Sequence, residues 1–586
     1  MCLPGTESRG IINGGGAHDL LILKHHGAGD RNEEDLTMRA RGDEGGATTT
    51  TITTTTTTFI RSFLQRLPHL PSDGVLPREL PLTERADAQR FLFDASPTMP
   101  LGTCNSYNLR KIGEELRSLV KIAGPIVITS MLIYSRSLVS MLFLGRLGKT
   151  ELAGGSLALG FSNITGYSLL RGLSTGMDPI CSQAYGAQRW SVISQTFQKT
   201  LCLLLLVAIP ISLLWLNMEP IFILLGQDPQ IIRVAKRYMA FAIPELIGQA
   251  QLLPLRIFFR TQGFTTALTL AAAFSALFHL PMNYFLVTYM DFGVAGIALG
   301  LAWNTFLFNL GLVIYLARSP HALKPWHGLT ILSAFQGWGP LLSLSLPSCV
   351  SVCLEWWWYE LMLFFCGWLS NPQASVAAMG ILLQTTGMLY IIPISLSGSL
   401  STRVGLSLGA GQPTRAQWTT LIGLIMAFAW GISAFIFMTA FRSMWGTMFT
   451  NDPQILDLIS TALPVLGLCE IGNVPQTASC GVLTATARPK LGVKINLFAF
   501  YLIGLPVAIL ATFTFKIGFL GLWFGLLSAQ LSCVGMMVYT LLHTDWKHQT
   551  RRAEQLTQAV EVKNETEENL EKTNDEESGL LTPTEV

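Results

Sequence analysis

Charge is scarce in this sequence, because only 13% of its 586 residues are Asp, Glu, Lys or Arg. In soluble domains, about a quarter of the residues are charged. Half of the residues are hydrophobic, and the mean hydropathy is +0.43. Because charge in bilayer hydrocarbon costs several kcal/mol, this composition is typical of a protein whose surface faces membrane lipid. The net charge of only +2 gives no indication of a nucleic-acid partner.

Motifs of covalent and metal chemistry are also lacking. The ten cysteines are scattered and form no CxxC or Cys/His cluster, although Cys349 and Cys353 share a helix face. We therefore expect neither a disulfide framework nor a metal site. The sequence contains no catalytic triad and no phosphate-binding loop, so it predicts neither an enzyme, nor a bound cofactor, nor ATP as the energy source.

Both ends of the chain are too polar to bury a core. Residues 1–110 are polar and glycine-rich early on, and they include a threonine tract from Thr48 to Thr58. Residues 544–586 are rich in charged residues. Such composition predicts disordered tails.

Twelve apolar runs alternate with short polar joints between these tails. A helix needs about 20 apolar residues to cross a bilayer, so each run predicts a membrane span. The runs lie near 118–143, 152–176, 196–216, 232–252, 266–288, 293–317, 340–366, 374–400, 416–440, 455–479, 491–514 and 518–542.

Basic residues in short loops mark the cytosolic side of a membrane protein. The side that carries both termini has Arg110, Lys111, Arg117, Arg189, Arg256, Arg260, Arg318, Lys324, Arg403, Arg415, Arg488, Lys490, Lys494, Lys547, Arg551 and Arg552. The other side has Arg146, Lys149, Arg233, Lys236, Arg237, Arg442 and Lys516. This excess predicts that both termini lie in the cytosol.

The two halves of the membrane region repeat. Residues 228–231 (Asp-Pro-Gln-Ile) recur at 452–455, and similar matches at offsets of 223 to 225 pair Gly186 with Gly409 and Pro281 with Pro506. A repeat of six spans keeps the same orientation in the membrane. We therefore expect two pseudo-symmetric six-helix lobes with a substrate site between them and an alternating-access mechanism. The expected N-lobe is 116–318, the cytosolic linker 319–339 and the C-lobe 340–543.

Acidic residues inside predicted spans are the first candidates for function. Glu355 and Glu360 lie in the seventh span, about 140° apart around a helix, so they cannot face the same spot. A carboxyl in an apolar cavity can bind and release a proton, but either residue could instead be a hydrogen-bonded structural glutamate. Glu470 and Asn473 share one face of the tenth span and could act in transport or only join helices.

Aromatic residues surround the first of these glutamates. Trp356, Trp357 and Tyr359 could stack on an aromatic or cationic substrate, although aromatic side chains are also ordinary core and lipid-facing material. Because consecutive residues cover most of a helix circumference, at most one or two of them can line a cavity.

Other polar residues in the spans have no partner that the sequence can assign. Arg136 and Arg171 are candidates to pair with membrane carboxylates such as Glu245. His279 is best interpreted as a packed, hydrogen-bonded residue. Asp178, before Pro179, is typical of a helix start and predicts a structural role.

Residues 116–546 resemble the multidrug and toxic compound extrusion (MATE) transporters, most of all their plant detoxification branch. The residues that carry this resemblance are 152–156 (Leu-Ala-Gly-Gly-Ser), 181–187 (Cys-Ser-Gln-Ala-Tyr-Gly-Ala), 353–357 (Cys-Leu-Glu-Trp-Trp), 402–405 (Thr-Arg-Val-Gly) and 408–410 (Leu-Gly-Ala). The resemblance implies two six-helix lobes and efflux of small organic compounds in exchange for protons or sodium ions. Membrane lipid is the other expected partner.

The resemblance also implies roles for single residues. Glu355 matches a glutamate tied to proton coupling in eukaryotic members. Asn473 falls where many members carry an acid, so Glu470, one turn earlier, is expected to take that role. Ser140 stands where many bacterial members carry an acid, which favours a C-lobe proton site over an N-lobe cation site, and H⁺ over Na⁺.

Two alternatives to this interpretation remain at the level of the sequence. A major facilitator also has twelve spans, but its basic glycine motif is absent from the joint at 183–187. A signalling protein could use the same fold to bind a ligand with little transport. The substrate itself is open, because plant members handle alkaloids, flavonoids, organic acids and hormones.

The C-terminal tail carries a candidate address. Glu576 lies four residues before Leu580-Leu581, a pattern that resembles adaptor-read sorting signals. If the motif is read, we expect an endosomal or vacuolar membrane, and otherwise the plasma membrane.

Overall fold

The computed structural model describes residues 104–326 and 337–561. Within these two ranges the chain forms helices and connecting turns and no strand. The all-α fold class is confirmed. Residues 1–103 of the expected N-terminal tail, and the Leu580-Leu581 motif, lie outside the described residues. Residues 104–110, which were also predicted to be disordered, form the first turns of a helix instead.

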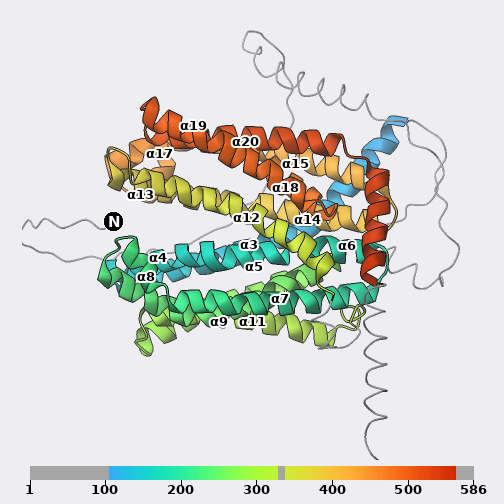
Figure 1. The fold of residues 1–586 in the computed structure, drawn as a ribbon, viewed down its shortest axis with the longest axis horizontal. Helices are drawn as coiled ribbons and strands as arrows, with labels where there is room; N and C mark the ends of the chain where they lie inside the picture. Colours follow the sequence, from blue (N-terminus) through green and yellow to red (C-terminus); the bar gives the residue numbers. More distant parts are fainter. Residues whose placement is uncertain (1–103, 327–336, 562–586) are drawn as a thin grey trace, which may run out of the picture. The chain divides into compact units, whose positions relative to one another are not determined.

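Six long helical segments build the first lobe (Figure 1). They are α3 (Cys104–Leu147), a segment of α4 (Lys149–Ser162), η1 (Asn163–Tyr167), α5 (Ser168–Ser174) and α6 (Met177–Gly186), then α7 (Trp190–Leu216), α9 (Pro229–Thr261), α10 (Thr265–Tyr284) with η2 (Phe285–Tyr289), and α11 (Val294–Arg318). The short α8 (Glu219–Leu224) lies between α7 and α9.

Six further segments build the second lobe (Figure 1). They are α12 (Gly339–Cys366), α13 (Pro372–Leu389) with α14 (Ile391–Gly409), α15 (Pro413–Ala440), α17 (Pro453–Ala485), the segment of α18 (Pro489–Asn496), η5 (Leu497–Gly504), α19 (Leu505–Ile509) and η6 (Leu510–Thr514), and α20 (Phe519–Leu542). The short α16 (Arg442–Trp445) and η4 (Gly446–Met448) precede α17.

These segments coincide with the twelve predicted spans. Ten of them are long and apolar enough to cross a membrane. The segment 149–186 is divided into pieces that are each too short by themselves, and α9 carries charged side chains such as Arg233, Glu245 and Arg256 along its length. Both exceptions contribute to the site described below.

Helix packing repeats in the two lobes, as the sequence offset predicts. In the first lobe α9 packs against α7 and α11, and α3 packs against α10. In the second lobe α17 packs against α15 and α20 in the same way, and α12 packs against α18. Each lobe has its own apolar core, with Trp215 buried in the first and Trp523 in the second.

Two glycines bring the lobes into close contact. A Cβ atom on Gly186 of α6 would collide with the carbonyl oxygen of Leu406, and a Cβ atom on Gly409 of α14 would collide with that of Gln183. One offset of 223 residues relates Gly186 to Gly409 and Gln183 to Leu406. The pseudo-two-fold axis therefore relates each contact to the other, as expected for two equivalent halves. Any larger residue at either glycine would push the lobes apart.

A buried carboxylate joins the lobes near this contact. Glu115 of α3 accepts hydrogen bonds from Nε and Nη2 of Arg403 at 3.1 and 3.0 Å, and from Nε of Arg415 at 2.6 Å. Thr419 donates a further bond at 3.3 Å. These four residues, which we name the Glu115 cluster, connect α3 of the first lobe with α14 and α15 of the second.

Residues 546–561 form a helix, which corrects the prediction of a wholly disordered C-terminal tail. This C-terminal helix buries Trp546 and Ala553 against the second lobe and Val560 against the first. Arg189, in the joint between α6 and α7, pairs with Glu561 at 3.2 Å and donates to Thr557 at 3.1 Å. The few apolar residues that this helix buries are separated by many charged residues in the sequence. The overall composition therefore suggested a disordered tail.

A buried arginine supports the same end of the molecule. Burial and the nearby charge of Arg552 lower the pKa of Arg488 to about 10, so Arg488 is still protonated at neutral pH. It donates a hydrogen bond to Thr544 at 3.0 Å, just before the C-terminal helix.

Candidate functional site

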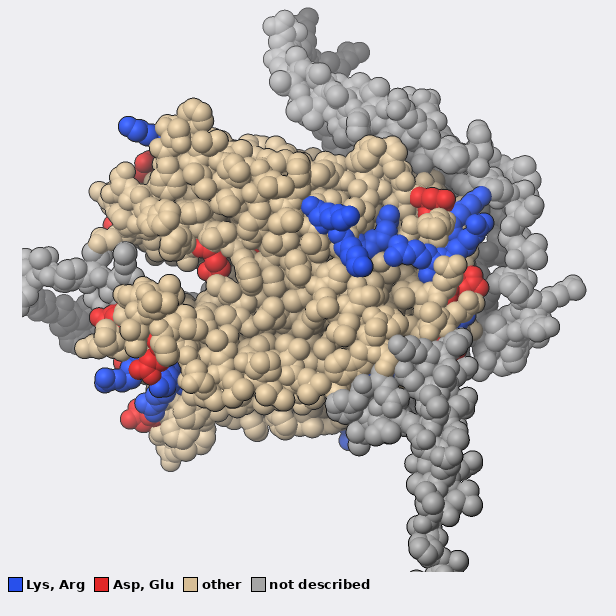
Figure 2. All heavy atoms as spheres, in the orientation of Figure 1, with Lys and Arg blue, Asp and Glu red and all other residues tan. Residues whose placement is uncertain are grey.

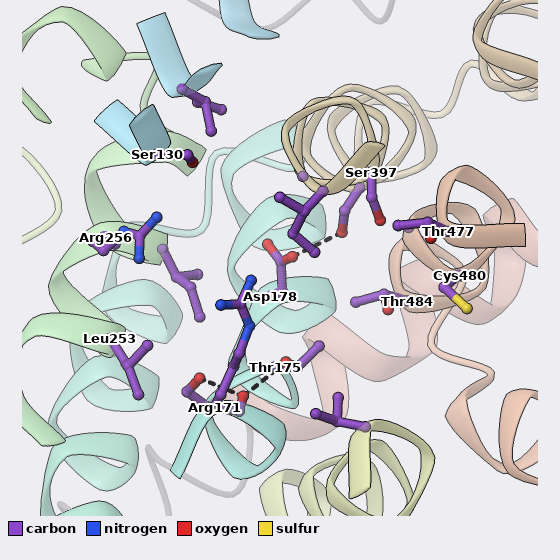
Figure 3. Close-up of a pocket in the computed structure, with 18 of the residues that line it drawn as sticks. Ser130, Arg171, Thr175, Asp178, Leu253, Arg256, Ser397, Thr477, Cys480 and Thr484 are labelled. Carbon is purple, nitrogen blue, oxygen red and sulfur yellow. Dashed lines mark hydrogen bonds between the residues drawn. The ribbon is translucent and has the colours of Figure 1, made fainter. Parts of the chain in front are cut away.

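A cavity of about 400 Å³ lies between the two lobes. The first lobe lines it from α3, α5, α6 and α9, and the second lobe lines it from α12, α13, α14 and α17 (Figure 3). Its wall combines apolar side chains with many hydroxyl groups, three arginines and two carboxylates. The repeat predicted a substrate site between the two halves, and this cavity is the candidate for it.

Prolines break two of the helices that form this wall. Pro179 has no N–H to donate to the carbonyl of Thr175, and the chain turns at Thr175 and Gly176 between α5 and α6. Pro393 likewise leaves the carbonyl of Leu389 without its helical donor, and the chain turns at Tyr390 between α13 and α14. Thr175 and Tyr390 both line the cavity at these breaks.

Asp178 lies in the first turn of α6, near the helix start that the sequence predicted, and it also lines the cavity. Its Oδ2 atom lies 2.6 Å from Nη2 of Arg260 and accepts a hydrogen bond from Ser401 of the other lobe at 2.9 Å. Figure 3 shows the Asp178 carboxylate directed between α6 and α14.

Arg256 and Arg260 also line the cavity, which corrects their placement in a cytosolic loop. Helix α9 continues to Thr261, nine residues beyond the predicted span, so both arginines lie on it one turn apart. Their position among apolar residues, in Leu-Pro-Leu-Arg-Ile-Phe-Phe-Arg, was the signal that could have identified them.

Arg171 of α5 also extends into the cavity (Figure 3). Its guanidinium carbon lies 5.7 Å from the ring centroid of Trp356, which lines the cavity from α12. The two lobes therefore meet in a cation–π contact, and Trp356 is the one predicted aromatic residue on the cavity wall.

Glu355 lies beside Trp356 on the wall and is only 8% exposed. Tyr390 and Gln476 lie next to its carboxyl, and Arg171 is close enough to attract it. No ion pair to Glu355 forms among the described residues. It is thus a buried carboxyl that faces the cavity without a direct cationic partner.

The other candidates on α12 lie away from the cavity. Glu360 is half-buried and Tyr359 partly buried, and neither lines the wall. Trp357 is 42% exposed on the outer surface. This distribution follows from the angle of about 140° between Glu355 and Glu360 around the helix.

Glu470 and Asn473 form a polar cluster inside the second lobe, behind the cavity wall. Asn473 donates to Oε2 of Glu470 at 3.0 Å and accepts from Gln530 of α20 at 3.5 Å. Glu470 is only 1% exposed. The charges of Glu355 and Glu470 both act on the hydroxyl group of Tyr359.

The first lobe has a counterpart of this cluster. Glu245 of α9 pairs with Arg136 at 3.3 Å and accepts from Thr305 at 2.7 Å. An offset of 225 residues relates Glu245 to Glu470 and Thr305 to Gln530. An arginine pairs with the carboxylate in the first lobe, whereas in the second lobe Glu470 accepts a hydrogen bond from the amide of Asn473.

Ser140, at the position where bacterial relatives often carry an acid, lies in the same lobe. Its hydroxyl lies 3.3 Å from Nε2 of His279, and Asn283 contacts the same ring nitrogen at 3.1 Å. His279 is thus buried and hydrogen-bonded, as predicted. Across residues 104–326 and 337–561, no three His, Cys, Asp or Glu side chains gather as a metal site would require.

Comparison with known proteins shows which family has this architecture. Residues 125–285 and 347–510, one stretch in each lobe, match the MatE family. Protein DETOXIFICATION 53 of Arabidopsis thaliana is 62% identical over 458 residues, which cover 78% of this chain and 94% of that protein. Protein DETOXIFICATION 48 of the same plant is 52% identical and is covered to 83%.

Solved structures agree with the sequence matches. The crystal structure of the eukaryotic MATE transporter AtDTX14 superposes with a TM-score of 0.73 at 30% identity, covering 77% of this chain and 99% of that one. The Vibrio cholerae MATE transporter VcmN, as a D35N mutant, gives 0.65 at 17% identity over 74% and 97% of the two chains, which bears on the fold alone. The chain therefore belongs to the MatE family, and it is a multi-pass membrane transporter of the plant detoxification branch rather than an enzyme.

Proposed function

We propose that the protein exports a small organic compound from the cytosol in exchange for protons, with Glu355 as the proton carrier. One observation carries the proposal. Of the two carboxylates on the cavity wall, Asp178 is paired with Arg260, whereas Glu355 forms no ion pair with any residue that the structure describes. The paired Glu245 of the first lobe is neutralised by Arg136, so it supports no competing cation site there.

The chemistry of a buried carboxyl links proton binding to closure of the cavity. Removing water from a carboxylate costs free energy, so uptake of a proton by Glu355 accompanies its enclosure. Protonation also removes the attraction between Glu355 and Arg171. Since Arg171 belongs to the first lobe and Glu355 to the second, this change alters the force between the lobes.

The arrangement of the lobes supports alternating access. The Glu115 cluster, the Gly186 and Gly409 contact and the C-terminal helix close one end of the molecule. Figure 2 shows a notch between the lobes at the opposite end, near α4 and α13. We assign the closed end, with Arg189 and Arg415, to the cytosol. Lipid then covers exposed apolar side chains such as Leu277.

Transport itself is tested with the full chain in sealed proteoliposomes. We expect accumulation of a substrate chosen from a panel of organic compounds when the vesicle interior is made acidic. The accumulation should collapse when a protonophore dissipates the gradient, and a sodium gradient should not replace it. Accumulation driven by sodium alone, or binding with no flux under any gradient, would reject the proposal.

Glu470→Gln should slow proton-driven flux about tenfold, the effect of about 1.4 kcal/mol on the rate-limiting barrier. The reason is that Glu470 supplies the carboxyl that many relatives carry at the Asn473 position. Adding Asn473→Asp should restore part of the flux, because the two side chains already touch at 3.0 Å. Initial rates in proteoliposomes measure both effects, and wild-type flux in the single variant would refute the role of Glu470.

Replacement of Leu580 and Leu581 by alanine should move the protein from internal membranes to the plasma membrane. The expectation rests on the sorting pattern with Glu576 and on a cytosolic C-terminus. Imaging of a fluorescently tagged full-length chain in plant cells measures the distribution. If variant and wild type share one distribution, the motif has no sorting role.

A further inference from the structure

The cavity wall carries an excess of positive charge. Arg171, Arg256 and Arg260 line it together with only two acids, Asp178 and Glu355. The pair between Arg260 and Asp178, at 2.6 Å, accounts for one charge of each sign. Two arginines then stand opposite one carboxyl, and protonation of that carboxyl would leave both uncompensated.

Within residues 104–326 and 337–561, no carboxylate pairs with Arg256. It forms no hydrogen bond or ion pair with any side chain in the described part of the chain. The charges that act on it are those of Arg171, Arg260 and Arg136, and all three repel it. Arg256 is partly buried. A cation at such a place without a counter-charge is costly, so a bound anion is its natural complement. Figure 3 shows the Arg256 side chain extending from α9 toward the space between the lobes.

The remainder of the wall suits the body of an aromatic molecule. Trp356, Tyr134 and Tyr390 line it, and the guanidinium carbon of Arg171 lies 5.7 Å from the ring centroid of Trp356. Hydroxyl groups from both lobes supply hydrogen-bond donors; these include Ser130, Ser348, Ser397 and Thr477.

We propose that the cavity selects organic anions, specifically aromatic carboxylates, with Arg256 as the main carboxylate ligand and Arg171 as its partner across the cavity. The planar fork of a guanidinium matches a carboxylate in two parallel hydrogen bonds. This inference rests on the proposed transport function and names its substrate class.

An anionic substrate constrains how exchange with protons can work. A charged Glu355 repels an anion, so a proton and the substrate cannot simply compete for one negative site. Coupling must then pass through the shape of the cavity. Tyr390 lies at the break between α13 and α14 and next to Glu355, where a change at the carboxyl can bend the wall.

Binding measurements on the full chain in lipid nanodiscs test the inference without requiring transport. The probes are naphthoate, the neutral naphthamide and the cationic naphthylmethylammonium, titrated by calorimetry. We expect naphthoate to bind at least about tenfold more tightly than the other two, as a charge-assisted hydrogen bond allows. Arg256→Gln should remove this advantage and leave naphthamide binding unchanged, and Arg256→Lys should keep part of it.

Arg237→Gln is the matched control, because Arg237 is an exposed arginine on the same helix. It should leave all three affinities unchanged. Arg171→Gln gives a second test should Arg256→Gln not fold. Tighter binding of the cation, an equal loss of naphthoate and naphthamide in both variants, or full displacement of naphthoate by sulfate would overturn the inference.

The outcomes also separate this inference from the proposed function. Proton-driven flux of naphthylmethylammonium without naphthoate binding would reject the anion site and keep the transporter proposal. Naphthoate binding that depends on Arg256, without flux under any gradient, would keep the anion site and reject proton-coupled export.

Discussion

Glu355→Gln should abolish transport driven by a proton gradient while leaving exchange of substrate for substrate intact. The carboxamide keeps the size of the side chain and its place beside Tyr390, but it cannot take up or release a proton. We expect gradient-driven accumulation to fall more than about 100-fold, because the loss removes the coupling step itself and not merely a contact that assists it. Accumulation and counterflow are both measured in proteoliposomes.

Glu360→Gln provides the control on the same helix. Glu360 lies away from the cavity, so its variant should transport at the wild-type rate. Full proton-driven accumulation by Glu355→Gln would show that the coupling proton binds elsewhere. Equal losses in the two variants would indicate a defect of α12 as a whole.

Glu115→Gln should open the end of the molecule that is closed in this structure. Removal of one partner from a buried ion pair costs about 3 kcal/mol or more, because the remaining charges stay buried. Here the variant leaves Arg403 and Arg415 without their shared carboxylate. A cost of about 3 kcal/mol shifts the population about 100-fold toward states in which this end is separated.

Spin labels at Gln188 and Gln412 can measure that separation, since these residues lie in the joints after α6 and α14. In a cysteine-depleted background, the distance between the labels should lengthen in Glu115→Gln. Glu554→Gln changes the same charge on an exposed face of the C-terminal helix and should leave the distance as it is. An unchanged distance in Glu115→Gln would mean that the Glu115 cluster does not hold the lobes together.

The spans could be predicted because the thickness of the bilayer sets the length of every apolar run. The two-lobe repeat could be predicted because matching residues recur at a nearly constant spacing in the sequence. Glu355 could be selected as a candidate for a similar reason, since a carboxyl in an apolar run is costly unless it has a partner or a function. The same logic located Glu470 and Asn473, although it could not place them behind the cavity wall.

Partners on different helices were beyond such reasoning. Nothing local in the sequence links Arg136 to Glu245, or Asp178 to Arg260, because tertiary packing alone brings them together. Arg256 and Arg260 were misassigned because a basic residue at the end of an apolar run can belong either to a loop or to a polar cavity inside the membrane. The extra helical turns of α9 decide between the two.

The C-terminal helix turns the tail into a mechanical connection between the lobes. It continues from the second lobe and ends on the first, where Glu561 meets Arg189. A movement that separates the lobes at this end must break that ion pair or drag the helix along. A protein that binds the chain beyond residue 561 would therefore exert force on the contact between the lobes. Through the tail, such a partner could slow the transport cycle.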